Sequence, residues 1–556
     1  MRQLLLASAL ALSALPSFSQ QTLVETIEVR VANIDVVVRD RSGHSISGLT
    51  KDDFELFDDG VPQKITNFYE VRRGEESSGD SGSSQEQVPL EVRQRRIVIF
   101  VDSASLTPTR KSAVLRSVEK FIDQKLRPED RCMLVSWRFD TQVVTPFTND
   151  RVALKRGLES IAHSGPFGSS SRTNLDLVKT QIQQLFNLAF DSQGDRIAVI
   201  SFPDAYERSR DLVTRHGYAL EAQERQLLGA LDAVTTNMAG LDGKKVLVFV
   251  SETMPENPAA DLYRFTNNLF GPYLNQNLVM DFETSLGVVG NDIPTEIDQM
   301  ARDASANGVT IYTIGAAASD SDFSADSADT VDYTYTFARD ANTSATLETV
   351  ASMTGGVAIT RTSNFDLAFD TIDRDLSSYY SLGYKPAGEG GDQHRITVKV
   401  KNPAYRVRSR RAFVVKSGDE QMADRVVANL YVDSTSNQWP VSIRMGKSKR
   451  DGRYFVVPVQ IVIPPTLTLI PQGDNNLAGS FILYFAVGDA SGRTSTVMRR
   501  PEDLKIPATS VATVRAKPMT FTTAFRIRGG ESLLSVAIID QLSGTMGFAR
   551  AKIVAR

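Results

Sequence analysis

Oxygen-bearing side chains follow two strongly apolar segments of the chain, near the point where each predicted strand ends. Asp102 comes directly after residues 97–101, and Glu252 comes two positions after residues 246–250. Thr173 stands shortly before an amphipathic helical pattern. Open α/β sheets place ligand sites at the carboxyl ends of their strands, and carboxylate and hydroxyl oxygens suit Mg²⁺, Mn²⁺ or Ca²⁺. The spacing therefore indicates an all-oxygen cation site.

The elements that would hold these residues alternate between strand and helix patterns from residue 95 to residue 415. Three segments are typical of strands covered on both faces: the uninterrupted apolar runs 97–101 and 246–250, and the β-branched segment 309–314. Thr107 and Pro108 form a helix start signal after the first run. This alternation predicts an α/β fold with a doubly wound, mostly parallel sheet. Residues 190–242 and 317–345 do not fit a minimal sheet, and we expect both insertions to lie outside the core.

The order of these loops resembles the von Willebrand factor type A (VWFA) fold and its metal-ion-dependent adhesion site. The flanking segments are similar to those of bacterial VWFA-related proteins of the acidobacterial type: Gly48–Phe54, Asp58–Gly60, Thr354–Gly356, Tyr379–Tyr384 and Pro386. The resemblance covers residues 22–415. It implies a domain that binds a protein partner through the carboxyl-end face of its sheet, with a metal ion that is completed by an acidic residue of the partner.

The metal motif of that family, Asp-x-Ser-x-Ser, is degenerate here. Asp102 takes the aspartate place, but Ala104 and Leu106 take the two serine places, and Ser103 and Ser105 lie one residue out of register. Because side chains alternate in direction along an extended segment, this shift aims both hydroxyls away from an ion unless the loop kinks. The candidate metal ligands are Asp102, Ser103, Ser105, Thr173 and Glu252, the last standing where an aspartate is usual.

Two interpretations of this degenerate site remain open from the sequence. In the first, the site binds a divalent cation such as Mg²⁺ or Ca²⁺ weakly. In the second, Asp102 and Glu252 form hydrogen bonds with the surrounding loops and helix N-termini, where a carboxylate is favoured. We expect no other cofactor.

Composition narrows the classes of function. With 62 Lys+Arg residues against 66 Asp+Glu, the formal net charge is -4, so the chain as a whole lacks the basic field that attracts nucleic acid. One cysteine, Cys132, and four histidines leave too few ligands for a Cys/His zinc site and allow no intrachain disulfide. We therefore predict no nucleic-acid partner.

The amino-terminal residues have the pattern of an export signal. Arg2 precedes an apolar stretch at 4–15, and Ser17 and Ser19 supply the small residues required for cleavage. We predict a signal peptide at 1–19 and an exported, periplasmic or secreted protein. We find no apolar run long enough for a transmembrane helix.

Composition and turn signals divide the remaining chain into modules. Residues 20–72 predict a small β module, and the polar, serine- and glycine-rich residues 73–94 predict a flexible linker. The VWFA-like domain follows at 95–415. Strand signals, the first of them at 426–432, predict a β-sandwich-like domain at 420–556.

These features favour a non-enzymatic adhesion or scaffold protein that binds a protein partner through the carboxyl-end face of the sheet. The first alternative is a metal-assisted hydrolase that uses Asp102 and Glu252, although no histidine-bearing or glycine-rich loop near them supplies a general base. The second alternative is a purely structural component of the cell envelope.

Overall fold

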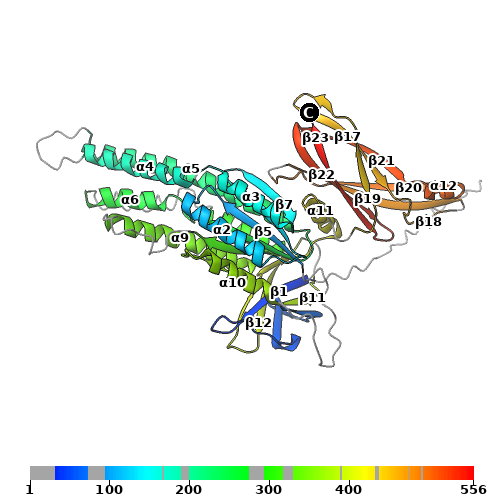
Figure 1. Ribbon diagram of the computed structural model, residues 1–556, viewed down its shortest axis with the longest axis horizontal. Helices are drawn as coiled ribbons and strands as arrows, with labels where there is room; N and C mark the ends of the chain where they lie inside the picture. The colour runs from blue at the N-terminus through cyan, green and yellow to red at the C-terminus, as the bar shows by residue number, and fades with distance from the viewer. Residues whose placement is uncertain are drawn as a thin grey trace, which may run out of the picture.

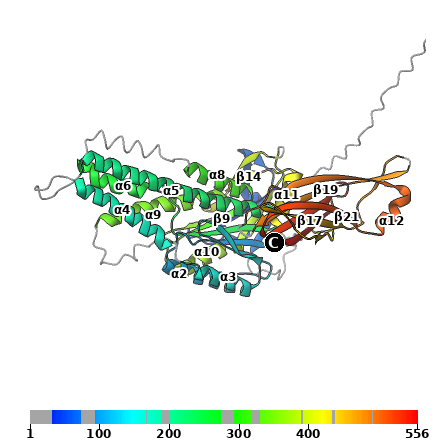
Figure 2. The ribbon, with the colours of Figure 1, turned by 90° about the horizontal axis from the view of Figure 1, so that it is seen from above.

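The computed structural model describes residues 32–72, 94–165, 168–189, 200–273, 293–316, 330–387, 391–432, 437–473, 475–489 and 492–555, with backbone only at 168–173 and 330–341. The predicted signal peptide and residues 73–93 of the predicted linker lie outside this set. The molecule is elongated, with helices projecting at one end and the carboxyl-terminal strands at the other (Figures 1 and 2). Within the described residues, no helix is both long and apolar enough to cross a membrane.

A six-stranded sheet forms the centre of the α/β domain, in the order β10-β9-β8-β5-β6-β7. Its strands are β5 (Arg95–Asp102), β6 (Arg131–Trp137), β7 (Thr141–Thr148), β8 (Lys244–Ser251), β9 (Val309–Gly315) and β10 (Ala358–Ile359). Only β7 runs antiparallel, to its neighbour β6. The strand order reverses direction at β5, as in doubly wound sheets. The predicted α/β class with a mostly parallel sheet is thereby confirmed.

Helices cover both faces of this sheet. One face packs against α2 (Pro108–Gln124), α3 (Arg151–His163) and α10 (Phe365–Ser377). The other face packs against the carboxyl-terminal half of α5 (Phe202–Met238), α8 (Ile293–Ala306) and the end of α9 (Thr330–Thr354). Alternate residues of β5 enter the two cores, since Ile97 and Ile99 face one layer and Val98 and Phe100 face the other.

The insertion at 190–242 does not lie outside the core, contrary to the expectation from sequence. Helix α5 carries Leu227, Leu231, Val234 and Met238 onto the sheet, where all four are buried. The first half of α5 instead joins α4 (Gly168–Ala189), α6 (Ala260–Phe270) and the short η2 (Gly271–Tyr273). We call these three helices and the first half of α5 the helical arm, because they project beyond the carboxyl edge of the sheet (Figure 1).

The second insertion also contributes to the fold. Residues 317–329 lie outside the described set, but the rest of the predicted insertion belongs to α9, and Thr343 and Ser344 at its end are buried. Thr313 of β9 donates a hydrogen bond to the Leu347 carbonyl of the same helix, at 3.0 Å. Helix α9 is therefore tied to the sheet rather than carried on a loop.

The amino-terminal strands do not form a module by themselves. They pair with strands that follow the α/β domain, in the sheets β13-β1-β11-β4 and β14-β12-β2-β3. The elements are β1 (Ala32–Arg39), η1 (Lys51–Asp53), β2 (Phe54–Asp58), β3 (Val61–Gln63), β4 (Asn67–Arg72), β11 (Ser378–Tyr384), β12 (Gln393–Val400), β13 (Arg406–Ser409) and β14 (Ala412–Val414). Side chains of both sheets share one core, including Ile34, Leu56, Leu382 and Ile396. The sequence prediction separated residues 20–72 from 95–415, whereas the strand pairing joins 32–72 with 378–414 and inserts the α/β domain between them.

The carboxyl-terminal strands form a two-sheet sandwich, as the sequence predicts for 420–556. Its elements are β15 (Ser442–Met445), β16 (Lys449–Asp451), β17 (Tyr454–Ile463), β18 (Ile470–Pro471), β19 (Asn476–Asp489), β20 (Met498–Pro507), η4 (Ala508–Ser510), α12 (Val511–Arg515), β21 (Met519–Arg528), β22 (Gly530–Asp540) and β23 (Met546–Ala555). Strand β17 pairs with β15, β16 and β21 in one sheet, and β19 pairs with β18, β20 and β22 in the other. Val459, Ile461, Leu483 and Val536 meet in the core between the sheets.

The strand predicted at 426–432 is wrong, because this segment ends a helix, α11 (Gly418–Ala428). Ser417 and Glu420 form a capping box, in which each side chain accepts a hydrogen bond from the backbone of the other residue. This cap fixes the helix start at Ser417, and the helix then continues through Val426 and Val427, whose β-branched side chains alone suggest a strand. Val426 and Val427 pack on the sheet of β19 and β22.

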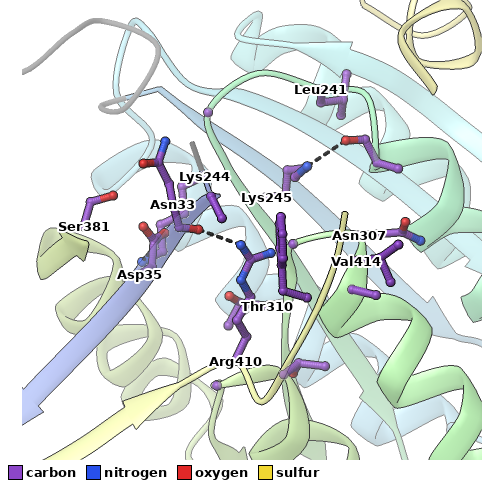
Figure 3. Close-up of a pocket in the computed structure, with 18 of the residues that line it drawn as sticks. Asn33, Asp35, Leu241, Lys244, Lys245, Asn307, Thr310, Ser381, Arg410 and Val414 are labelled. Atoms are coloured by element: carbon purple, nitrogen blue, oxygen red, sulfur yellow. Dashed lines mark hydrogen bonds and ion pairs between the residues drawn. The ribbon is translucent and has the colours of Figure 1, made fainter. Parts of the chain in front are cut away.

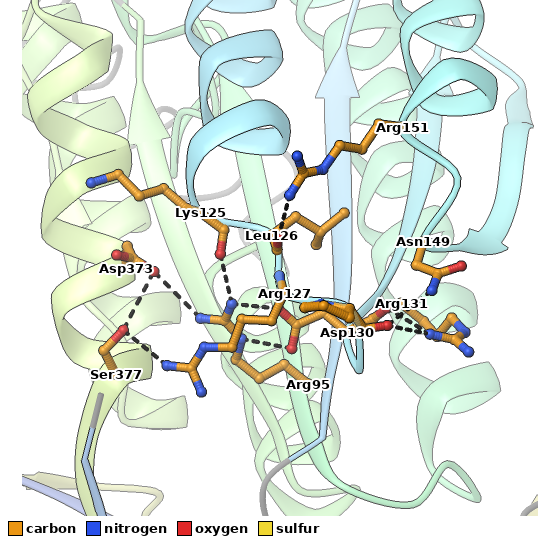
Figure 4. A network of polar contacts seen from close by, with 11 residues as sticks. Arg95, Lys125, Leu126, Arg127, Asp130, Arg131, Asn149, Arg151, Asp373 and Ser377 are labelled. Carbon is orange, nitrogen blue, oxygen red and sulfur yellow. Dashed lines mark hydrogen bonds and ion pairs between the residues drawn. The ribbon is translucent and has the colours of Figure 1, made fainter. Parts of the chain in front are cut away.

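A buried charge network closes the amino edge of the sheet (Figure 4). Arg95 at the start of β5 is 1% exposed and donates to both carboxylate oxygens of Asp130, with Nε 2.9 Å from Oδ1. Its Nη1 is 3.4 Å from the Asp373 carboxylate of α10, and its Nη2 donates to the Lys125 carbonyl at the end of α2. A buried arginine with these partners ties two helices and a strand together.

The paired segments predict how the chain behaves after cleavage. A protease recognition sequence inserted between Ser83 and Ser84 is expected to give two fragments that elute together in size-exclusion chromatography, because β1 and β2 remain paired with β11 and β12. The fragments should separate only in denaturant. Ile34→Asp, which places a charge in the shared core, should weaken this association, and separation of the unmutated fragments in native buffer would contradict the strand pairing.

Candidate functional site

The candidate site lies where β5 and β8 end side by side, at the point where the strand order reverses. Asp102 is the last residue of β5 and Ser251 is the last residue of β8. The Ser251 hydroxyl donates to Asp102 Oδ2 at 2.7 Å, and its oxygen is 3.0 Å from Ser105 Oγ. The other carboxylate oxygen of Asp102 accepts from the Ala104 and Ser105 amides, at 3.1 and 3.2 Å. Both oxygens of Asp102 are thus held by the protein itself.

Burial sets the electrostatics of Asp102. The residue is 1% exposed, and burial raises the pKa of its carboxyl to about 6 against the opposing effect of hydrogen bonds from Ser105 and Ser251. Glu224 of α5 is also buried, and burial, together with the charge of Asp102, raises its pKa well above the usual value. Glu224 Oε1 has no hydrogen-bond partner among the described residues. The two carboxyls therefore favour the protonated state more than exposed acids do.

A cavity of about 140 Å³ adjoins these acids. Asp102, Ser105, Glu224 and Glu252 line it, together with His216 of α5. Burial lowers the pKa of His216, and its Nε2 is buried with no partner in the part of the chain that the structure describes. Helix α5 thus forms one wall of the pocket over the switch point of the sheet.

Glu252 turns away from Asp102. Its Oε2 accepts from the Thr107 amide at 2.8 Å, and its Oε1 is 3.9 Å from Arg110 Nε. Thr107 precedes Pro108, the first residue of α2, so this carboxylate stabilises the helix start that the Thr107 side chain does not cap. The predicted hydrogen bonds of Asp102 and Glu252 to loops and a helix N-terminus are present in the structure.

The two predicted serine ligands point in different directions from the loop after β5. The chain turns at residues 103–105, which returns the Ser105 hydroxyl to Asp102 and leaves Ser103 Oγ 2.9 Å from Ser136 Oγ on β6. Ala104 and Leu106 are buried in the two opposite cores of the α/β domain. Thr173 lies in the first turns of α4, where the structure describes the backbone only. The structure therefore brings Asp102 and Ser105 together and directs the Ser103 hydroxyl to β6. Glu252 stays beside Ser105, because its backbone amide donates to Ser105 Oγ at 3.0 Å, but its carboxylate is bonded to the start of α2.

This donor set does not fit the metal centre that the VWFA resemblance implies. The two hydroxyls that the family pattern needs are replaced by the buried Ala104 and Leu106. The Asp102 oxygens are occupied by two amides and a hydroxyl, so a cation would have to displace these hydrogen bonds to be bound there.

Two residues of the site were missed from sequence. Ser251 directly precedes Glu252. Because Glu252 is an acid, the sequence pattern favours it as the ligand, but Ser251 is the residue whose side chain reaches Asp102. Glu224 occupies the same face of α5 as Leu227, Leu228 and Leu231. An acid within an apolar helical stripe is the signal that could have found it.

Comparisons with known proteins leave the chain without an assigned family. No protein-family model and no curated protein matches it. Among solved structures it is similar to an aerotolerance-related membrane protein from Bacteroides fragilis, at 13% identity and a TM-score of 0.23, over 51% of this chain and 98% of that chain. It is also similar to the protein BatB from Bacteroides thetaiotaomicron, at 11% identity and a TM-score of 0.24, over 51% of this chain and 97% of that chain. A third similar structure holds three N-terminal domains of the type V pili tip protein Mfa5 from Porphyromonas gingivalis. The identity is 9% and the TM-score 0.24, over 94% of this chain and 76% of that chain. Overlap at these TM-scores transfers no function.

The raised pKa of Asp102 predicts a pH-dependent effect of Asp102→Asn. Because the folded protein binds the Asp102 proton more tightly than the unfolded chain, wild type loses stability as pH rises from about 4 to about 6. The isosteric, neutral Asn avoids this loss, so it should raise the free energy of unfolding by roughly 3 kcal/mol above that range and by little near pH 4. Urea unfolding across this pH range measures the difference. Ser103→Ala, which removes a neighbouring buried hydroxyl but no titrating group, should shift stability equally at every pH.

The donor geometry also predicts that wild type gains no stability from magnesium. A ligand at 100 times its dissociation constant would stabilise the fold by about 2.7 kcal/mol. We expect the melting temperature to be the same in millimolar MgCl₂ and in EDTA. A saturable increase in Mg²⁺ that Asp102→Ala abolishes would show instead that Asp102 and Ser105 reorganise around a metal ion.

Proposed function

We propose that this chain is an exported, non-enzymatic binding or scaffold protein built around a VWFA-type domain. The strand order, the single antiparallel strand β7 and the position of Asp102 at the switch point support this class. The partner is a protein, and its binding does not require a metal ion. Export rests on the amino-terminal pattern of Arg2, the apolar stretch at 4–15, and Ser17 and Ser19.

The carboxyl edge of the sheet offers little surface to a partner, because α5 and its neighbours cover it. Asp102, Ser251 and Glu252 are each at most 2% exposed. A partner carboxylate could reach Asp102 only if α5 moved away. The docking surface is therefore displaced from the edge of the sheet to the helical arm that grows out of it.

The observation that carries this proposal is the surface of the helical arm. Its interior is an aromatic cluster in which Phe186 and Phe270 pack edge to face, with ring centroids 5.3 Å apart. Around this cluster the arm exposes large apolar side chains, with exposed fractions of 43–55%: Leu177, Leu188, Tyr218 and Tyr273, the last of which also packs on Phe186 and Phe202. Tyrosines of this kind combine apolar area with a polar group and are enriched at protein interfaces. The arm thus has its own core and still presents apolar groups to solvent.

The hydrolase alternative finds less support. It requires Asp102 and Glu252 to act together, but Glu252 is occupied by the start of α2 and Arg110. A purely structural role would leave the exposed apolar groups of the arm without a use.

The arm surface can be tested with two charge-introducing variants. Leu177→Glu and Tyr218→Glu should each reduce binding of the purified full chain to envelope proteins of its source organism by about tenfold or more, because each places a charge in an apolar contact. Leu367→Glu is the matched control, since Leu367 is an exposed leucine of α10, 54% exposed against 55% for Leu177, on a helix outside the arm. Cross-linking followed by mass spectrometry identifies which envelope protein contacts residues 174–189 and 200–222.

Two results would overturn the proposal. Equal binding by the two arm variants and the Leu367 control would place the interface elsewhere. A hydrolytic activity of the purified chain that Asp102→Asn abolishes would make the protein an enzyme. Retention of binding in EDTA is the expected result for an interface that lacks a metal.

A further inference from the structure

A larger cavity lies at the opposite, amino edge of the six-stranded sheet (Figure 3). Its volume is about 690 Å³, within the range of small-molecule sites, which run from about 300 to 1,000 Å³. Three parts of the chain form its walls. Strand β1 supplies Asn33, and the residue that follows β13 is Arg410. The start of β8 supplies Lys244 and Lys245, and α11 with the segment before it supplies Lys416, Asp424 and Arg425.

Lys245 and Arg410 converge on one point of this cavity. Gly308, just before β9, adopts φ +72, and a Cβ at this position would lie 3.0 Å from Arg410 Nη1 and 3.6 Å from Lys245 Nζ. The absence of a side chain at Gly308 leaves room between the two cations. Arg410 Nη2 donates to the Asn33 carbonyl at 2.6 Å, and Lys245 Nζ donates to the Ala239 carbonyl at 2.7 Å.

These two cations differ from the other basic side chains around the cavity. Lys244 is 3.4 Å from Asp35, and Lys416 is 2.6 Å from Asp424. Arg408, in the same wall, is 2.6 Å from Asp375. Within the described part of the chain, neither Lys245 nor Arg410 has a carboxylate within 4.0 Å, and both donate only to backbone carbonyls.

The acids that act on these two cations do so only from beyond direct contact: Asp35 on Arg410, and Asp424 and Asp242 on Lys245. Arg410 Nε is buried with no acceptor among the residues described. Burial, followed by the charges of Arg410 and Lys416, lowers the pKa of Lys245 to about 8. Two like charges held this close in a partly buried wall cost free energy unless an anion lies between or beside them.

We propose that the amino-edge cavity binds a small organic anion, whose phosphate or carboxylate group is held by Lys245 and Arg410. A guanidinium and an ammonium supply the donors that such oxyanions require, and charged hydrogen bonds to them are among the stronger ones in proteins. Arg425, which lines the same cavity, adds a third positive charge to the site. The rest of the cavity volume accommodates the body of the ligand. This site is separate from the arm surface and from the pocket at Asp102.

The test uses inorganic phosphate and citrate as probes of the full-length protein. Each is titrated in isothermal titration calorimetry and in thermal unfolding, against sodium chloride at the same ionic strength. We expect saturable binding of one or both anions, and the comparison separates a phosphate site from a carboxylate site. Lys245→Met, which keeps the length and apolar stem of the side chain, should weaken binding by about tenfold or more.

Lys552→Met is the matched control, because Lys552 is an exposed lysine of β23, far in sequence from the cavity walls, and its loss should leave the affinity unchanged. Arg410→Met is a second variant, with circular dichroism and the melting temperature to establish that it is folded. The proposal fails if neither anion stabilises the protein more than chloride does, or if Lys245→Met binds as tightly as Lys552→Met.

Discussion

Strand β11 lies between β1 and β4 in one sheet, and it begins at the residue that follows the end of α10. The attachment of the α/β domain depends on this pairing, because it fixes both ends of that domain on the two small sheets β13-β1-β11-β4 and β14-β12-β2-β3, which we call the first sandwich. The register runs from Ala32 opposite Tyr384 to Val36 opposite Tyr380. Tyr380 adds a hydrogen bond from its hydroxyl to the Ile46 carbonyl at 3.0 Å. With no loop between α10 and β11, the helix layer and the sandwich have little freedom to rotate against each other.

This attachment explains why charged groups are concentrated at the amino edge of the sheet. Asp375, near the end of α10, pairs with both Arg39 of β1 and Arg408 of β13. Lys244 reaches from β8 to Asp35 of β1 and lies 3.4 Å from the centre of the Tyr379 ring. Such ion pairs hold the two domains in register, and among the described residues they leave Lys245 and Arg410 without a carboxylate in direct contact. The carboxyl edge of the sheet instead carries acids, which are buried beneath α5.

Local patterns in the sequence were sufficient for the central strands. The apolar runs at 97–101 and 246–250 and the β-branched segment at 309–314 are the buried strands β5, β8 and β9, and the Thr107-Pro108 signal marks the start of α2. Segments of this composition need no distant information, because any sheet covered on both faces accepts them. The segment at 426–432 was mistaken because its valines resemble a strand, while the capping box that makes it a helix lies earlier, at Ser417 and Glu420.

Contacts between distant segments could not be predicted in this way. The position of Asp102 at the end of a strand follows from the sequence, but its partner Ser251 is 149 residues away. The burial of Glu224 depends on where α5 meets the sheet, and the cavity at Lys245 depends on the pairing of β1 with β13. A local pattern can mark Glu224 as an acid in an apolar helical stripe, but no local pattern shows which distant residues these side chains meet. Glu252 illustrates the difficulty, since its position at the carboxyl end of β8 suggested a ligand while its nearest donor, the Thr107 amide, belongs to another loop.

The insertion of one domain into another also constrains the order in which the chain can fold. Leu49 and Tyr380 are joined by a hydrogen bond across 331 residues, so the first sandwich cannot form until nearly the whole α/β domain has been made. Closing so long a loop is costly in entropy unless the intervening residues are already compact. The α/β domain must therefore collapse first and bring its two ends together. Until then β1 and β2 have unpaired edges, and a chaperone that shields them would speed maturation more than one that acts on the carboxyl-terminal sandwich, whose strands pair largely with near neighbours in the chain.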